Sequence, residues 1–451
     1  MTERDADGIV TRREYLRRAA VGALAGLAGC PGVGSNGGTT PTEATTATGT
    51  FPSTDTPASA DTATPTATPT DAPTPTATPT DTPAPTATGR PAVPSGVEGT
   101  VEAYRYGESR RAFASGSAGP AEKPAVAAAW TLPDAVYQPV VDGSTVYLAY
   151  RQRGGGAPTV EARDLRSDEP LWGADLGGRA GAAPTLADGA LFVQTDRGVH
   201  RVTRGGRTGW TRTGVGTTGF APTVAGDRVF ALGATGLVAF GLGGARQWGI
   251  PLSYRALASA AATPDRLYLV LPRDGEGFDL LALETRDGDT AWRARVPVTL
   301  GNPPVVTDGR VYVASAGDPG RVTALAADDG SDLWTADARL TSSPAVTDDA
   351  VVVAGGGTVT ALAPDGTEAW SRFVGDAVVA GPVAGVERVY VGTEADDGTG
   401  RLHALDADGG DLRWTVATQA PVLELPAVLD GGVLVVTRAG GTATLSALVD
   451  E

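Results

Sequence analysis

The chain has 451 residues and a formal net charge of −16, with 52 acidic against 36 basic side chains. Affinity for nucleic acid comes largely from Lys and Arg that neutralise phosphates, so this charge argues against a nucleic-acid partner. The single cysteine, Cys30, and the two histidines, His200 and His403, exclude a disulfide framework, structural zinc sites of the Cys/His type and Cys–His nucleophilic chemistry.

The charged residues also indicate an environment. Lys123 is the only lysine, and all other basic side chains are arginines. A strongly acidic surface repels itself at low salt and is screened at molar salt. The composition resembles that of haloarchaeal proteins, which predicts a halophilic protein; an ordinary acidic protein is the alternative.

The first 29 residues are predicted to be an export signal. The sequence TRREYLR at residues 11–17 resembles the twin-arginine motif, with Arg12 and Arg13 as its pair. The Ala- and Gly-rich residues 19–29 are too few to span a bilayer, which takes about 20. The sequence LAGC at 27–30 resembles a lipobox, which makes Cys30 the predicted lipid attachment site. We therefore expect export by the twin-arginine route and a lipid anchor on the outer face of the cytoplasmic membrane. The alternative is a short amphipathic helix with a chance cysteine.

Residues 30–96 are predicted to be a disordered linker. Between residues 39 and 89 the chain is almost entirely Thr, Pro, Ala and Asp, with no apolar run to bury. An extended polyproline conformation rises about 3.1 Å per residue, so some 65 residues reach on the order of 200 Å. O-glycosylation of this segment is a hypothesis. Residues 97–125 are an uncertain extension, in which residues 101–106 form either an extra strand or an ordered end of the linker.

The remaining chain repeats one unit around eight tryptophans. They are spaced 36 to 44 residues apart, and six of them follow a glycine by four residues. Alternating apolar stretches precede the glycine, and a proline, an Asp-Gly turn and a β-branched run follow the tryptophan. Gly and Pro are too dense for helical repeats, while Asp-Gly between β-rich runs indicates hairpins. Each unit therefore predicts one four-stranded blade of a β-propeller. The tryptophans are Trp130, Trp172, Trp210, Trp248, Trp292, Trp334, Trp370 and Trp414.

The two ends of the repeat region predict how the ring closes. Residues 445–450 match residues 402–407 of the preceding repeat, but no Gly and Trp follow them. Trp130, in contrast, comes before the first proline of the repeats. The strand around Trp130 is therefore expected to complete the last blade, which gives an all-β, eight-bladed propeller over residues 126–451. Such closure removes open sheet edges.

The blade phrase Pro-x-Val-x-Asp-Gly-x-Val-Tyr-Val, followed by Ala-Leu-x-x-x-Asp-Gly-x-x-x-Trp, resembles the pyrroloquinoline-quinone (PQQ) repeat, a WD40-like blade. The resemblance covers residues 126–451. That family includes quinoprotein alcohol dehydrogenases and the non-enzymatic propeller lipoprotein BamB. The resemblance implies that the eight tryptophans dock between neighbouring blades and have a structural role.

The enzymatic members of this family hold PQQ over the channel, with a calcium ion bound by Glu and Asn, an Asp base and often a vicinal disulfide. This chain cannot form the disulfide, because Cys30 is its only cysteine. Polar residues that precede the innermost strands are candidates to face the channel: Tyr137, Gln138, Arg255, Asn302 and Glu424. Only Glu424 and Asn302 resemble the calcium pair, and they lie three blades apart. The repeated Asp-Gly pairs are explained by turn chemistry.

We therefore expect no PQQ, no calcium or other metal and no catalytic residue. The predicted function is a membrane-anchored extracellular scaffold, monomeric, that binds a protein or surface-glycan partner. The alternative is a PQQ-dependent quinoprotein dehydrogenase. The two histidines fall on equivalent strands of different blades and are expected to be surface or packing residues.

Overall fold

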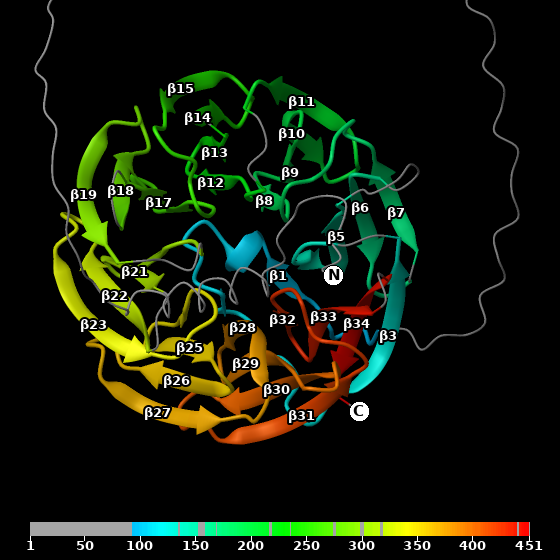
Figure 1. Ribbon diagram of the computed structural model, residues 1–451. Coiled ribbons are helices and arrows are strands. Elements are labelled where there is room, and N and C mark those ends of the chain that lie inside the picture. Colours follow the sequence, from blue (N-terminus) through cyan, green and yellow to red (C-terminus); the bar gives the residue numbers. More distant parts are fainter. Residues whose placement is uncertain are drawn as a thin grey trace, which may run out of the picture. The chain divides into compact units, whose positions relative to one another are not determined.

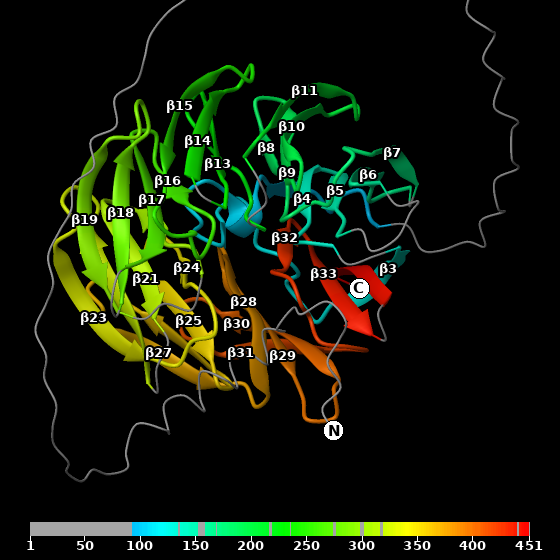
Figure 2. The ribbon, with the colours of Figure 1, turned by 45° about the horizontal axis from the view of Figure 1, so that its top comes forward.

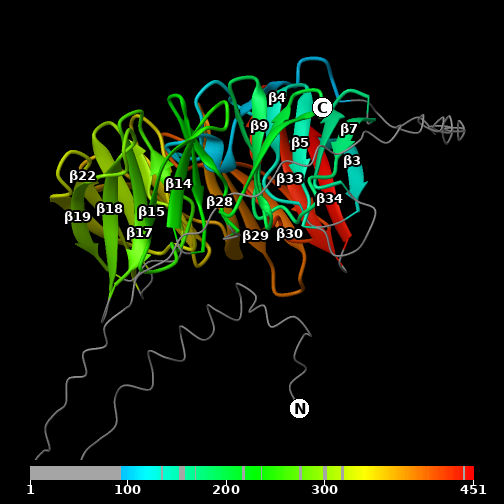
Figure 3. The same cartoon turned by 90° about the horizontal axis from the view of Figure 1, so that it is seen from above.

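A computed structural model describes residues 93–450 except 134–135, 152–157, 168, 216–218, 235, 274–276, 298–301, 316–318 and 440–441. Within these residues the strands form eight sheets arranged around a central axis (Figure 1). Seen edge-on, the strands cross the thickness of the ring (Figure 3). The all-β, eight-bladed propeller predicted from the sequence is confirmed.

The first four blades take their strands in chain order from the axis outward. Blade 1 contains β4 (Val140–Gly143), β5 (Thr145–Ala149), β6 (Val160–Asp164) and β7 (Pro170–Ala174). Blade 2 contains β8 (Thr185–Ala187), β9 (Ala190–Thr195), β10 (Gly198–Thr203) and β11 (Thr208–Thr213). Blade 3 contains β12 (Thr223–Ala225), β13 (Arg228–Leu232), β14 (Gly236–Gly241) and β15 (Arg246–Pro251). Blade 4 contains β16 (Ala261–Ala262), β17 (Arg266–Pro272), β18 (Phe278–Glu284) and β19 (Thr290–Val296).

Three further blades follow the same order, and the eighth differs. Blade 5 contains β20 (Val305–Thr307), β21 (Arg310–Ser315), β22 (Gly320–Ala326) and β23 (Asp332–Ala338). Blade 6 contains β24 (Ala345–Val346), β25 (Val351–Gly355), β26 (Thr358–Leu362) and β27 (Glu368–Phe373). Blade 7 contains β28 (Ala377–Gly385), β29 (Arg388–Glu394), β30 (Gly400–Asp406) and β31 (Leu412–Thr418). Blade 8 contains β32 (Ala427–Leu429), β33 (Gly432–Ala439), β34 (Thr442–Val449) and, from the other end of the chain, β3 (Ala125–Leu132).

Strand β3 closes the ring. It pairs antiparallel with β34, and Trp130 lies opposite Leu445. In Figure 1 the cyan β3 runs along the outer side of the red C-terminal strands. The closure predicted from the unpaired Trp130 is therefore correct.

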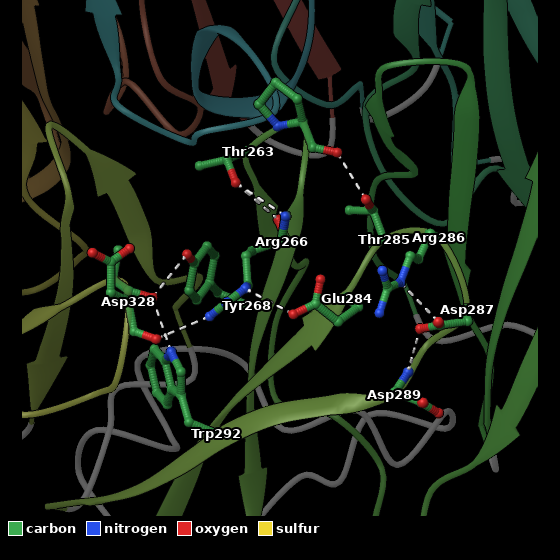
Figure 4. A network of polar contacts seen from close by, with 12 residues as sticks. Thr263, Arg266, Tyr268, Glu284, Thr285, Arg286, Asp287, Asp289, Trp292 and Asp328 are labelled. Carbon is green, nitrogen blue, oxygen red and sulfur yellow. Dashed lines mark hydrogen bonds and ion pairs between the residues drawn. The ribbon is translucent and has the colours of Figure 1, made fainter.

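Six of the eight blade tryptophans, from Trp172 to Trp370, dock on the turn between the third and fourth strands of the next blade. Trp292 illustrates the contact (Figure 4): its Nε1 donates a hydrogen bond of 2.9 Å to the Ala327 carbonyl, and its ring lies 5.9 Å from the Tyr268 ring. Gly330 lies beneath this ring with φ +74°, and a Cβ added to it would be 2.5 Å from Trp292. The glycine four residues before one tryptophan thus lies against the ring of the tryptophan in the preceding blade. The same contact occurs at Gly206, Gly244, Gly288, Gly366 and Gly410.

Apolar side chains between the blades form the core. The second and third strands of most blades are almost entirely buried, as in β21 and β22, because they are covered by sheets on both sides. The outermost strands alternate or are exposed, as in β27. Short Asp-Gly turns connect the inner strands; Asp308 (φ +49°) and Gly309 (φ +70°) form one between β20 and β21.

Truncation tests the closure of the ring. A chain that ends after Asp430 lacks β33 and β34, so β3 loses its only strand partner and two sheet edges become exposed. We expect this variant to aggregate or self-associate, as measured by size-exclusion chromatography with light scattering. The control ends after Val449 and loses only two hydrogen bonds to the Asp450 carboxylate. It should remain monomeric; equal behaviour of the two variants would contradict closure by β3.

Candidate functional site

The axis of the propeller is filled by the chain itself. Residues 93–120, here called the plug, run through the centre of the ring before the chain reaches β3 (Figures 1 and 2). The plug contains β1 (Gly99–Val101), the 3₁₀ turn η1 (Tyr104–Tyr106) and β2 (Phe113–Ala114). Strand β1 pairs antiparallel with β4, and β2 pairs parallel with β28. Residues 101–106, for which an extra strand or a linker end were the alternatives, therefore contain the end of a short strand and a turn. Residues 93–96, at the end of the range assigned to the linker, already contact the ring, and Val93 is buried.

Backbone hydrogen bonds join the plug to the innermost strands of most blades. The carbonyls of Glu102, Glu108 and Ser109 accept hydrogen bonds of 2.6 to 3.0 Å from N–H groups in blades 2, 4 and 5. The carbonyls of Arg111 and Ala112 accept hydrogen bonds of 2.8 and 2.9 Å from blades 6 and 7. Without the plug, these N–H groups of the innermost strands would face an open channel. The carbonyls of the plug thus serve as their hydrogen-bond acceptors.

Two arginines hold the plug from within. Arg105 and Arg110 are almost completely buried, and both donate to backbone carbonyls of the ring. Arg105 Nη2 donates to the carbonyls of Ser343, at 3.0 Å, and Pro344 in blade 6.

Arg110 reaches the other side of the ring. It donates from Nε to the Ala260 carbonyl at 3.0 Å and from Nη2 to Thr223 Oγ1 at 2.8 Å. Desolvation lowers the pKa of Arg110 to about 10, and the positive charge of Arg105 contributes to the same shift. Since this value lies above neutral pH, Arg110 remains charged inside the ring.

The plug backbone is strained. Among the described residues other than glycine, six have positive φ, and four of them lie in the plug: Arg105 (58°), Tyr106 (74°), Arg110 (60°) and Ala112 (50°). Such conformations cost on the order of 1–3 kcal/mol each and persist only where the surroundings impose them. The hydrogen bonds of the two buried arginines and of Tyr106 Oη, which donates to the Pro426 carbonyl at 2.7 Å, supply that constraint.

A small hollow, which we call the mouth, lies on the axis at the end where the chain enters the innermost strands. Its volume is about 240 Å³, and Tyr104 of the plug contributes to its lining. Small residues such as Ala182, Ala183 and Ser259 make up much of the wall, and Glu424 is the one charged residue among the described residues that line it. Larger hollows lie elsewhere: about 490 Å³ beside blades 3 and 4, and about 640 Å³ at the opposite end of the plug.

The predicted channel-facing residues have different positions. Tyr137 and Glu424 line the mouth, and the Arg255 guanidinium lies 5.9 Å from the ring of Phe220 in the same wall. Gln138 is fully buried, and its Oε1 accepts a hydrogen bond of 2.8 Å from the Arg105 backbone N–H. Asn302 directly precedes Pro303 of the mouth.

The described lining of the mouth has few of the groups that a PQQ–calcium site uses. PQQ is a polycarboxylate, and calcium takes six to eight oxygen ligands. The described lining includes one carboxylate, Glu424, and no Arg or Lys. The guanidinium groups of Arg255 and Arg151, however, contact the lining residues Phe220 and Tyr137. The described part of the chain also contains no group of three or more His, Cys, Asp or Glu placed to hold a metal ion. Two side-chain amides, Gln138 Nε2 and Asn302 Nδ2, are buried without a hydrogen-bond partner in the described structure.

The two histidines are buried in matching positions on β10 and β30. His200 lies between Thr195 Oγ1, at 2.9 Å, and Thr211 Oγ1, at 3.0 Å. His403 lies between Thr393 Oγ1 and Thr415 Oγ1, each at 3.0 Å. Burial lowers the pKa of both imidazoles, that of His403 to about 4 with a contribution from Arg401. Both therefore serve as neutral hydrogen-bonding groups inside single blades and share no ligand.

The residues of the predicted export signal, Arg12, Arg13 and Cys30, lie outside the described residues. Across the described ranges, none of the helices has the length and apolar character needed to cross a membrane.

Comparison with known proteins identifies the repeats. The family model described as outer membrane protein assembly factor BamB matches residues 156–248, 234–377 and 355–449. A search of curated proteins finds no match.

Solved structures share the fold. BamB from Moraxella catarrhalis is 16% identical with a TM-score of 0.56, over 72% of this chain and 99% of that one. Quinohemoprotein alcohol dehydrogenase from Comamonas testosteroni is 14% identical with a TM-score of 0.62, over 79% and 81%. The computationally designed protein Ika8 is 14% identical with a TM-score of 0.58, over 73% and 99%. At such identities the likeness shows the fold alone. Because the family model covers more than half of the sequence, this chain belongs to the PQQ-repeat family described as outer membrane protein assembly factor BamB.

Proposed function

We propose that this protein is a lipid-anchored, extracellular propeller that acts as a non-catalytic binding or assembly module for a protein or surface-glycan partner. The observation that carries the proposal is the filled axis. The plug occupies the centre of the ring, and the mouth of about 240 Å³ is smaller than the roughly 300–1,000 Å³ of ordinary ligand sites. The hollow of about 640 Å³ is larger, but it is lined mainly by the plug itself. The described lining of the mouth offers a single carboxylate, that of Glu424, where calcium takes six to eight oxygen ligands.

The face around the mouth is the proposed binding surface. By topology, the loops that lead into the innermost strands of all blades lie on this face. Two of these loops carry large exposed apolar side chains, Tyr254 before β16 and Leu423 before β32. Apolar and aromatic anchors of this kind, surrounded by polar residues, dominate the energetics of protein interfaces. The acidic character of the chain favours partners that bind at high salt through apolar contacts.

A titration separates this function from its alternative. Residues 93–451, in molar salt, are titrated with PQQ and calcium in a calorimeter, and we expect no saturable binding. Saturable binding that is lost in Glu424→Gln or Asn302→Ala would favour the quinoprotein dehydrogenase instead. Asn302 is chosen for this test because its side-chain Nδ2 has no hydrogen-bond partner in the described structure.

Cross-linking on intact cells tests the binding surface. We expect Tyr254→Ala with Leu423→Ala to reduce capture of the partner at least several-fold, because we propose these side chains as hot spots, whose truncation costs about 2 kcal/mol or more each. The matched control is Leu171→Ala with Leu333→Ala, two exposed leucines on outermost strands. If the control pair reduces capture equally, the outer rim and not the mouth face binds.

Fractionation tests the proposed anchor. Cys30→Ser should release the protein from the membrane fraction, because the thiol is the proposed site of lipid attachment. Arg12→Lys with Arg13→Lys should instead retain the protein inside the cell, since that pair is proposed to direct export. A Cys30→Ser protein that stays as firmly bound as the parent would show that the anchor lies elsewhere.

A further inference from the structure

The glycine–tryptophan lock is missing on both sides of blade 8. Six blade tryptophans lie against a glycine of the next blade, from Trp172 through Trp370. Trp414 of blade 7 and Trp130 of blade 8 have no such glycine, since Val126 and Asp168 stand four residues before the next tryptophan. Blade 8 is also the blade that is assembled from both ends of the chain.

At the junction of blades 7 and 8, the end of the plug replaces the lock. Trp414 Nε1 donates to the carbonyl of Pro120 at 3.4 Å, whereas the six tryptophans from Trp172 to Trp370 donate to a turn of the next blade. That turn is split here between the two chain ends. The Asp450 carboxylate joins the ends again by accepting hydrogen bonds of 3.0 Å from the backbone N–H groups of Ala121 and Glu122.

Blade 7 holds the same end of the plug through its side chains. Tyr390 Oη donates to the Ala118 carbonyl at 2.8 Å, and Arg388 Nη1 donates to the same oxygen at 3.3 Å. Residue Gly119 then forms a parallel bridge with Asp430, in the inner hairpin of blade 8.

At the junction of blades 8 and 1, the start of the plug contributes the contacts. Trp130 Nε1 is buried without a partner among the described residues. Val93 and Val97 pack in the same apolar cluster as Trp130. Arg166, in the turn on which Trp130 would dock, donates to the Ser95 carbonyl at 2.9 Å and pairs with Glu98 at 3.1 Å.

Both ends of the plug meet at the same hairpin of blade 8. The Asp430 N–H donates to the Glu98 carbonyl at 2.8 Å, and Asp430 also bridges Gly119. Blade 8 is thereby held between the start and the end of one continuous segment, which is anchored in the centre of the ring by Arg105 and Arg110.

We propose that the plug is a clamp that keeps blade 8 closed, and that the ring opens first at blade 8 when the clamp is loosened. The clamp replaces the glycine–tryptophan lock at the two junctions that lack it. Its first residue follows directly on the Thr/Pro-rich segment, so tension on that segment is applied to the clamp before it reaches any blade.

Native-state hydrogen exchange of the full chain tests the clamp. The double variant Arg166→Ala with Tyr390→Phe removes the Arg166 contacts with Ser95 and Glu98 at the start of the plug and the Tyr390 hydrogen bond at its end. It retains the aromatic ring against Trp414. We expect exchange in β3 and β32–β34 to accelerate on the order of tenfold or more, because each lost hydrogen bond lowers the opening free energy. Blades 3 to 5 should exchange as in the parent.

The matched control is Arg286→Ala with Tyr312→Phe. Arg286 lies in the corresponding turn of blade 4, and Tyr312 has the corresponding place beside Trp334 in blade 5. This pair should leave blade 8 unchanged. Parent-like exchange of blade 8 in the first variant overturns the proposal, and so does acceleration spread evenly around the ring. Because the readout is local exchange, it is independent of whether the proposed binding function is correct.

Discussion

Gly330→Ala is expected to destabilise the protein by about 2–5 kcal/mol. Two effects add. The residue has φ +74°, a left-handed conformation that costs a residue with a side chain roughly 1–2 kcal/mol. The new methyl group would also lie 2.5 Å from the Trp292 ring, and overpacking of this kind costs typically 1–3 kcal/mol. The midpoint of urea unfolding at constant slope measures the change.

Gly309→Ala, in the same blade, separates the two effects. Gly309 has φ +70°, but no atom lies within 4 Å of the position of its Cβ. This variant should therefore show only the conformational part, about 1–2 kcal/mol. In a Trp292→Ala background, the cost of Gly330→Ala should fall to the same value. Equal costs for both glycines in the parent protein would show that the tryptophan contact does not constrain the turn.

His403 is expected to make stability depend on pH below neutrality. Its pKa is about 4 in the folded protein against 6.5 for the free side chain, because burial and Arg401 disfavour the charged imidazole. Between these two values the unfolded chain binds more protons than the folded one. The stability due to neutral His403 is therefore complete above pH 6.5, and about 3 kcal/mol of it is lost as the pH falls to 4.

Histidine NMR measures this directly, because the chain contains only two histidines. The His403→Gln variant assigns the two signals, and we expect the His403 signal to titrate near pH 4. As the pH falls through this range, the unfolding free energy of the parent should decrease relative to that of His403→Gln. Titration of His403 near 6.5 would mean that the Thr393–His403–Thr415 arrangement does not exist in solution.

The blades could be predicted from the sequence because each carries its own signals. The tryptophans recur in every repeat and the Asp-Gly turns and alternating apolar strands in most of them, and each element depends mainly on its neighbours. The unpaired Trp130 was sufficient to predict how the ring closes. Even the special status of blade 8 is visible in the sequence, since Val126 and Asp168 stand where the other repeats have glycine.

The plug could not be predicted, because its conformation is imposed by the ring. Arg105 and Arg110 lie in an arginine-rich stretch, which predicts exposure to solvent. Both are nevertheless buried and donate hydrogen bonds to backbone carbonyls of distant blades. Arginine is not a residue type that favours positive φ, so the sequence does not predict this conformation at Arg105 and Arg110. The regular spacing of Val93, Val97 and Val101 was the one available indication of burial. Of the candidate channel residues, Gln138 accepts a hydrogen bond from the Arg105 backbone, and it is buried because the plug occupies the axis that the sequence predicts to be open.

The pairing of β3 with β34 sets the order in which the molecule can be completed. These strands come from residues 125–132 and 442–449, so they can join only after residues 442–449 have been synthesised. A nascent chain on the ribosome holds seven blades at most in finished form, and the arginine-bearing segment must already lie inside when the last strand arrives. Contacts between such distant segments form slowly. Closure of the ring is therefore a late step of folding, and until it occurs β3 lacks its strand partner β34 and sheet edges stay open.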